Sequence, residues 1–357
     1  MKRVLVAAVG VAIVALQLGG VAHVSAKPAT GQVVLIAQNE ELDVYDISTH
    51  TLRPQPLVKP SDWVNGTPCF IPGDKAGRFV EADDNPSDGP DHFDGDTNPF
   101  FGVFTKGGSR DFTAPYGTLG RIGGLPASDP AHTEDPAGCA FDAAGNLFGI
   151  DVGFNHTPGQ GDGKIVEFFA PDYTTHCVID SGLDQPGMVA FDSAGRLYVP
   201  ESGAGQIQRY SNFPAGAGAC GTTVPTEELW SVGLGTPIGI VPAPGGGWAV
   251  SSVLVPAGVF HVSEVNGVGV VDGVLASPGP TTGTPFGLAY DAGGNLYYAD
   301  LGVGPNPDPT DPLDAVPGAG ALRSVPAGAP PVPQALATGM SFPDGVAVVS
   351  ATAISPR

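Results

Sequence analysis

Short carboxylates gather in one polar segment in the first third of the chain and recur in a later loop. The segment contains an insertion, residues 85–98, that is rich in Asp, Gly and Asn. Clustered carboxylates of this kind are typical of flexible Ca²⁺ sites, which coordinate the ion through oxygen. A solvated acidic loop without a metal is the alternative. The sequence predicts a calcium site formed by Asp83, Asp84, Asp94, Asp96 and Asp151.

Histidines in the same set of loops offer a second chemistry. Zinc is bound by His nitrogens together with carboxylates. No His-Glu-x-x-His spacing is present, so ordinary surface histidines are the alternative. The candidate zinc ligands are His92, His132, Glu134 and His156.

Other catalytic signatures are missing from the sequence. It contains no Gly-x-Ser-x-Gly elbow, no phosphate-binding loop followed by a helix, and no dinucleotide fingerprint. We therefore expect no nucleotide cofactor and assign no catalytic residue.

The elements that must position these residues come from a repeat of about fifty residues. Its anchoring glycines are spaced 49, 52, 48 and 58 residues apart: Gly138, Gly187, Gly239, Gly287 and Gly345. A strand-rich repeat of this length predicts the blades of a β-propeller. An open β-solenoid is the alternative.

One copy shows how a blade is built. Residues 187–191 form a short apolar inner strand, 192–195 a turn with Asp and Gly, and 196–199 the returning strand. Third and fourth strands follow at 206–210 and about 227–232. Each blade is thus a four-stranded antiparallel sheet.

Six copies are present, and the last, at 342–349, has only one strand before the chain stops. Residues 32–37 and 42–47 are strands with no inner strand ahead of them. We predict an all-β, six-bladed propeller in which these N-terminal strands complete the last blade and protect its edge. Residues 27–357 form this single domain.

Residues 1–26 are predicted to be a secretory signal. Lys2 and Arg3 precede an apolar run, and Val24-Ser25-Ala26 supplies small residues for cleavage. The protein is then secreted or held in the cell envelope, with no membrane insertion after cleavage. An uncleaved N-terminal anchor is the alternative.

The chain is strongly acidic, with 36 Asp and Glu against 15 Lys and Arg, and a formal charge of -21. Loss of the predicted signal removes two positive charges and leaves -23. This field opposes binding to nucleic acid. It favours cations and cationic partners.

Four cysteines in an exported chain suggest two disulfides. Cys69 and Cys139 share one register of the inner strand in successive blades, and Cys177 and Cys220 both precede or begin a fourth strand. We favour the pairs Cys69–Cys139 and Cys177–Cys220. For the first pair, two buried thiols remain an alternative, because inner strands can stand too far apart for a bond.

The unit Pro-x-Gly-φ-Ala-Phe-Asp-x-x-Gly-Asn/Arg-Leu-Tyr-Val, where φ is apolar, resembles an NHL repeat. Its clearest copies are those that contain Gly138, Gly187 and Gly287. Over about residues 66–349 the chain is similar to the six-bladed propellers related to gluconolactonase, the senescence-marker-protein group. That resemblance implies the propeller fold. The group contains metal-dependent lactonases, a zinc-dependent lyase of peptidyl hydroxyglycine, and binding modules.

The resemblance also implies where metal ligands would lie, since the group's metal-dependent members place them immediately before the inner-strand glycine, facing the central channel. Here those positions hold Ala137, Pro186, Ile238, Phe286 and Asp344. One carboxylate among apolar residues does not supply the several ligands that calcium or zinc needs. We predict Asp344, Phe286 and Ile238 to line the channel without a metal shell there.

These observations favour a binding module that takes a small molecule, a peptide or a surface partner through its acidic face. The alternatives are a metal-dependent hydrolase or lactonase with an atypical site, and a purely structural cell-surface module.

Overall fold

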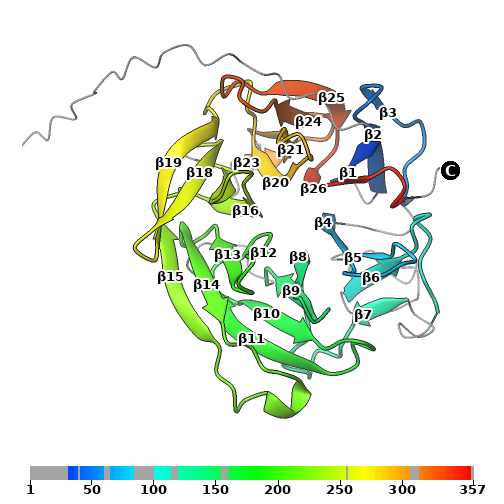
Figure 1. Cartoon of the computed structure of the whole chain (residues 1–357), viewed down its shortest axis with the longest axis vertical. Coiled ribbons are helices and arrows are strands. Elements are labelled where there is room, and N and C mark those ends of the chain that lie inside the picture. The colour runs from blue at the N-terminus through cyan, green and yellow to red at the C-terminus, as the bar shows by residue number, and fades with distance from the viewer. Residues whose placement is uncertain are drawn as a thin grey trace, which may run out of the picture.

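The computed structural model of the chain describes residues 31–38, 41–59, 65–83, 100–113, 120–153, 159, 161–254, 256–305 and 313–354. Within them, six four-stranded antiparallel sheets stand in a ring around a common axis, as Figure 1 shows. The helical structure described is a 3-10 turn, η4 (Ala217–Ala219). The predicted all-β, six-bladed propeller is confirmed.

Blades 1 to 3 each run outward from an inner strand beside the axis. Blade 1 comprises β4 (Asn65–Phe70), β5 (Phe79–Asp83), β6 (Phe100–Phe104) and β7 (Arg121–Gly123). Blade 2 comprises β8 (Pro136–Phe141), β9 (Leu147–Asp151), β10 (Gly163–Phe168) and β11 (His176–Leu183). Blade 3 comprises β12 (Ala190–Phe191), β13 (Leu197–Glu201), β14 (Gln206–Ser211) and β15 (Thr226–Val232).

Blades 4 to 6 repeat the plan. Blade 4 comprises β16 (Pro237–Pro242), β17 (Trp248–Ser252), β18 (Gly258–Val265) and β19 (Val268–Ala276). Blade 5 comprises β20 (Pro285–Tyr290), β21 (Leu296–Asp300), β24 (Gly320–Val325) and β25 (Gln334–Met340). A small hairpin, β22 (Val303–Pro305) with β23 (Leu313–Ala315), is inserted into blade 5.

Blade 6 closes the ring with strands from both ends of the chain. Its order is β26 (Pro343–Ser350), β1 (Gln32–Gln38), β2 (Glu41–Asp46) and β3 (Thr51–Leu52). β1 pairs antiparallel with β26 from Gln32↔Ser350 to Gln38↔Pro343. The predicted closure is confirmed, and the short strand β3, which the sequence did not indicate, supplies the fourth strand.

An Asp residue begins the turn between the first two strands of a blade, and its side chain bonds to the turn's backbone. In blade 3, Asp192 Oδ1 accepts the backbone N–H groups of Ala194 and Arg196, each at 2.9 Å. Asp142 and Asp291 make the equivalent bonds in blades 2 and 5. This side-chain-to-backbone bonding is why Asp begins the turn in each clear repeat.

The inner strand of blade 3 is shorter than the predicted 187–191, because its first residues bond outside a regular ladder. The Met188 N–H donates to the Ile238 carbonyl of blade 4 at 2.8 Å. The Gly187 N–H donates to the Pro200 carbonyl, also at 2.8 Å. The start of the inner strand of blade 3 is therefore hydrogen-bonded to blade 4.

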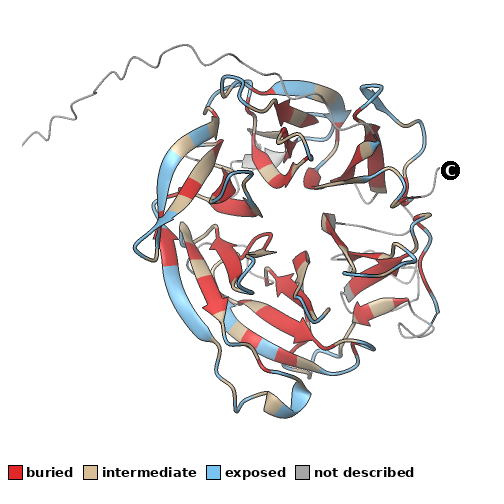
Figure 2. Cartoon of the chain, in the orientation of Figure 1, coloured by how far each residue is buried: buried red, intermediate tan, exposed pale blue. Residues whose placement is uncertain are grey.

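Apolar side chains between neighbouring blades form the core. Figure 2 shows that the strands near the axis are largely buried. Between blades 3 and 4, Tyr198, Trp230 and Trp248 pack together, and the rings of Tyr198 and Trp248 lie 4.2 Å apart between centroids. Such interdigitation between large faces holds each blade against the next.

Glycines let the inner strands approach one another closely around the axis. A Cβ on Gly345 would lie 1.7 Å from the carbonyl oxygen of Gly66, which joins blade 6 to blade 1. A Cβ built on four other inner-strand glycines would also lie too close to a carbonyl oxygen of the next blade. The distances are 1.9 Å for Gly66 to Ala137, 2.2 Å for Gly187 to Ile238, 2.4 Å for Gly239 to Phe286 and 2.6 Å for Gly287 to Asp344. The repeated glycine is therefore needed for the backbone contact between blades.

We expect Gly345→Ala to lower the free energy of unfolding by at least about 3 kcal/mol, because the new methyl group meets backbone that cannot rotate away. Denaturant unfolding measures this change. Gly218→Ala is the matched control, since a Cβ there meets nothing within 4 Å, and it should change stability by less than about 0.5 kcal/mol. Equal effects of the two substitutions would contradict the close-contact explanation.

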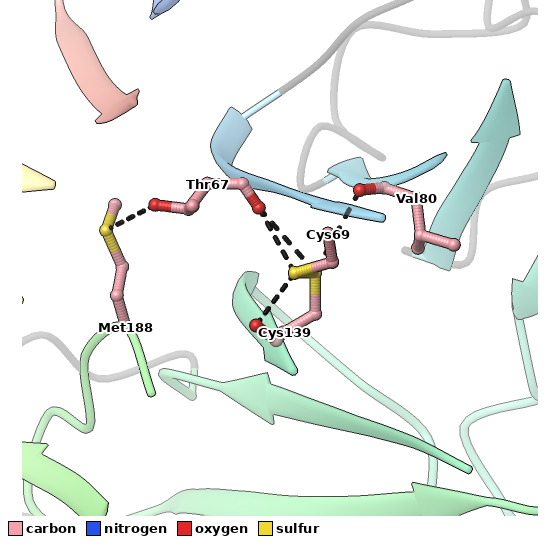
Figure 3. The surroundings of a disulfide bond; sticks show 5 residues. All are labelled: Thr67, Cys69, Val80, Cys139 and Met188. Carbon is pink, nitrogen blue, oxygen red and sulfur yellow. Dashed lines mark hydrogen bonds between the residues drawn. A yellow bond between two sulfur atoms is a disulfide. The ribbon is translucent and has the colours of Figure 1, made fainter. Parts of the chain in front are cut away.

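Both predicted disulfides form, and each joins two blades. Cys69–Cys139 links the inner strands of blades 1 and 2, with Cα atoms 6.1 Å apart, as Figure 3 shows. Cys177–Cys220 links β11 of blade 2 to the segment before β15 of blade 3, with Cα atoms 5.7 Å apart. Blade 2 is thus covalently tied to both neighbours. Disulfides of this kind are typical of proteins outside the reducing cytoplasm.

No helix among the described residues is long and apolar enough to cross a membrane. The predicted signal, residues 1–26, lies outside the described residues and stays a prediction.

Candidate functional site

Each blade contributes one residue immediately before its inner-strand glycine, and we call these six the axis positions. They are Asn65, Ala137, Pro186, Ile238, Phe286 and Asp344. Four consecutive blades, 2 to 5, carry apolar residues, whereas blades 6 and 1 carry Asp and Asn. Asn65 was not among the positions predicted from the sequence, because its repeat is the weakest and its glycine, Gly66, lies outside the regular spacing.

Asp344 is a buried carboxyl group at the seam where blade 6 meets blade 1. Its Oδ2 accepts the backbone N–H of Gly66 at 2.8 Å, and its Oδ1 has no hydrogen-bond partner among the described residues. Burial raises its pKa to about 7, and the charge of Asp135 adds to the rise, against the Gly66 N–H, which lowers it. Asp135 precedes the inner strand of blade 2, so the seam and the start of blade 2 face a common region near the axis.

Glu81 is a second carboxyl group at the same seam, and it lies on β5 with no solvent exposure. Neither Oε1 nor Oε2 has a hydrogen-bond partner among the described residues. Burial raises its pKa well above the usual value, and the charge of Asp344 raises it further. We call Glu81 and Asp344 the seam acids.

Glu81 was not among the site residues predicted from the sequence; it lies four residues before the insertion of residues 85–98. A signal was present: Glu81 follows Phe79 and Val80 in a strand, where an alternating pattern does not explain a charge. Burying an ionised group without a partner is costly, which makes Glu81 a candidate site residue.

The apolar axis positions are largely withdrawn from solvent. Ile238 is 9% exposed, and its Cδ1 lies against Gly187 of blade 3. Phe286 is half-buried and packs against the cluster between blades 5 and 6. Below the glycine level, Thr67 Oγ1 of blade 1 lies 3.0 Å from Met188 Sδ of blade 3, as Figure 3 shows. Side chains of non-adjacent blades therefore meet at the axis.

Asp151, predicted to bind calcium, is fully buried and already engaged. Its Oδ1 accepts the backbone N–H groups of Glu134, Asp135 and Gly153, at 3.1, 2.7 and 3.1 Å. Its Oδ2 lies 3.4 Å from the Nζ of Lys164. These contacts hold the loop before the inner strand of blade 2.

The same capping contact recurs at the end of the second strand in other blades. Glu201 accepts the N–H of Asp184 at 2.9 Å, and Asp300 accepts that of Thr284 at 2.7 Å. Asp151 therefore has a structural role that the repeat itself explains, whatever else it binds.

The remaining candidate ligands are only partly placed. His132 Nδ1 lies 2.6 Å from the carbonyl oxygen of Leu125, and the backbone of Glu134 bonds to Asp151. Asp83 ends β5. Asp84, His92, Asp94, Asp96 and His156 lie outside the described residues. The calcium and zinc sites stay predictions.

The described residues do not fit a divalent metal at the axis. They contain no group of three or more His, Cys, Asp or Glu side chains able to hold one ion. The seam acids provide two carboxyl groups, whereas Ca²⁺ takes six to eight oxygen ligands and Zn²⁺ four.

Comparison with known proteins supports the fold. No protein-family model and no curated protein sequence matches the chain. Among solved structures, it is similar to a gluconolactonase from Xanthomonas campestris, with 16% identity, a TM-score of 0.51, and coverage of 73% of this chain and 75% of that one. It is also similar to the periplasmic gluconolactonase of Pseudomonas aeruginosa, with 15% identity, a TM-score of 0.51, and 90% and 99% of the two chains covered.

A chain from the nidogen–laminin complex matches as well, with 14% identity, a TM-score of 0.51, and 89% and 98% of the two chains covered. Two gluconolactonases and a chain of the nidogen–laminin complex thus share this architecture, and identities this low establish the fold and not the activity. The chain has the fold of the gluconolactonase-like six-bladed propellers.

Proposed function

We propose that this protein is an exported binding propeller that holds a ligand at the ring axis, on the face where the seam acids lie. The observation that carries the proposal is the division of the axis positions. Four blades carry apolar residues at these positions, and the two blades beside the seam bring together Asp344 and Glu81. Three of their four carboxyl oxygens lack hydrogen-bond partners among the described residues. A mostly apolar surface with a few convergent polar groups is typical of sites that bind small molecules or side chains.

A metal-dependent lactonase is the second candidate. It is favoured by the similarity to two gluconolactonases and by Asp344, the one carboxylate at an axis position. The apolar residues at the other axis positions weigh against it, because a metal that polarises a substrate needs several fixed ligands.

One set of measurements separates the candidates. Purified protein is assayed for metal content and for hydrolysis of a lactone panel with Ca²⁺, Zn²⁺ or Mn²⁺, and in parallel it is screened against a fragment library by thermal shift. We expect no hydrolysis above background, and a ligand whose affinity falls at least fivefold in Phe286→Ala or Ile238→Ala. Metal-dependent hydrolysis that is lost in Asp344→Asn would favour the lactonase over the binding propeller.

A further inference from the structure

We propose that the seam acids bind a primary alkylammonium group, the charged end of a lysine side chain or of an aliphatic amine. This inference deepens the proposed function and rests on it, because both place a ligand at the axis. It names the chemistry that would recognise that ligand.

The acceptors available at the seam match an ammonium group in number. Three carboxyl oxygens lack hydrogen-bond partners among the described residues: Glu81 Oε1, Glu81 Oε2 and Asp344 Oδ1. The fourth, Asp344 Oδ2, is engaged with the Gly66 N–H. An ammonium group has three N–H donors and no acceptor, so when both carboxyl groups are ionised it can satisfy the three free oxygens without leaving a donor unpaired.

Other cations match the seam less well. A guanidinium group brings five donors in a flat fork and would leave some of them buried and unpaired. A divalent metal requires more oxygen ligands than two carboxyl groups provide. A compact ammonium also compensates the buried negative charge directly, which removes the cost of holding the two acids together.

Burial limits the shape of the ligand. Glu81 is not exposed and Asp344 is only 9% exposed, so only the end of a narrow chain could reach them. A methylene chain behind the ammonium group would then lie near the apolar axis residues Ile238 and Phe286. Lysine side chains behave in this way, with an apolar stem and a charged tip.

The charged surroundings predict how binding depends on pH. Among the described residues, the charge of Asp135 acts on Asp344, and the guanidinium of Arg110 lies over Gly102, the strand partner of Glu81. With a pKa of about 7, Asp344 is mostly protonated at pH 6 and ionised at pH 8.5, while an alkylammonium stays charged up to about pH 10. The raised pKa of Glu81 acts in the same direction, so affinity should rise as the pH is raised from 6 to 8.5.

The test uses the full mature chain and isothermal titration with n-butylammonium, cadaverine and a short lysine peptide. n-Butanol, n-butylguanidinium and CaCl₂ serve as comparison probes. We expect the amines to bind, and Glu81→Gln or Asp344→Asn to weaken them at least tenfold, because each removes a charge-assisted acceptor. Glu167→Gln is the matched control: Glu167 is also a buried carboxyl group with an unpartnered oxygen, but it lies beside the turn of blade 2, and its loss should change affinity less than twofold.

Tighter binding of the lysine peptide than of cadaverine would identify a protein partner, and the reverse order a free amine; either supports the shared chemistry. Amines that bind no better than n-butanol, or guanidinium or Ca²⁺ that binds as well as they do, would overturn it, as would equal losses in Glu167→Gln. The melting temperature of each variant reports folding, and Glu81→Gln carries the test if Asp344→Asn does not fold. An uncharged ligand that depends on Phe286 would leave the proposed function standing and refute the ammonium; no ligand of any kind would refute both.

Discussion

Removal of residues 27–47 is expected to abolish the folded protein. It deletes all of β1 and β2, and exposes the whole pairing edge of β26. Val33, Val34, Leu35 and Ile36 are each at most 1% exposed, and burying side chains of this size stabilises a protein by about 1.5–3 kcal/mol apiece. The four together amount to about 6 kcal/mol or more, which is comparable to the whole stability of an ordinary domain.

The measurement is the yield of soluble protein and its cooperative melting by circular dichroism, starting from the chain without residues 1–26. Trimming only to residue 30 is the control, because β1 begins at Gln32, and it should leave the melt unchanged. Adding a synthetic peptide of residues 31–47 should restore a cooperative transition to the longer deletion. If the longer deletion melts cooperatively near the parent temperature, the ring does not depend on this closure.

The architecture could be predicted because each clear repeat carries the same glycine and turn aspartate at fixed positions in the sequence. Gly345 and the corresponding glycines recur because the backbones of neighbouring blades meet near the axis. Asp192 and the corresponding aspartates recur because the carboxylate accepts N–H groups of the turn that follows it. These requirements act within a few residues or at a fixed spacing, so a single sequence reveals them. The blade closure followed from counting strands at the two ends.

The seam acids could not be found in the same way. Glu81 and Asp344 stand 263 positions apart in the sequence, and only ring closure brings their blades together. No local pattern relates the two residues. Glu81 also lies close to Asp83 and Asp84, which were predicted as calcium ligands. Asp151 has a structural role that its local sequence does not show, because its carboxylate accepts the Asp135 N–H and holds the loop before the inner strand of blade 2.

Breaking the Cys177–Cys220 disulfide is expected to lower the free energy of unfolding by about 4 kcal/mol. The two cysteines are 43 positions apart, and in the chain-entropy model a loop of this length is stabilised by about that amount when it is closed. The bond also lies in the apolar cluster between blades 2 and 3, where Cys177 is 4% exposed. Denaturant unfolding of the Cys177→Ala/Cys220→Ala variant measures the loss.

Reduction of the parent protein separates the two contributions to that loss. A reductant opens the loop but keeps both sulfur atoms in the core, so the entropic part appears in the reduced parent and the packing part only in the variant. Reduction also opens Cys69–Cys139, whose separation of 70 positions gives a similar entropic contribution, and a Cys69→Ala/Cys139→Ala background removes it from the comparison. An unfolding free energy that does not change on reduction in that background would show that contacts between the blades, and not the covalent link, hold blade 3 to blade 2.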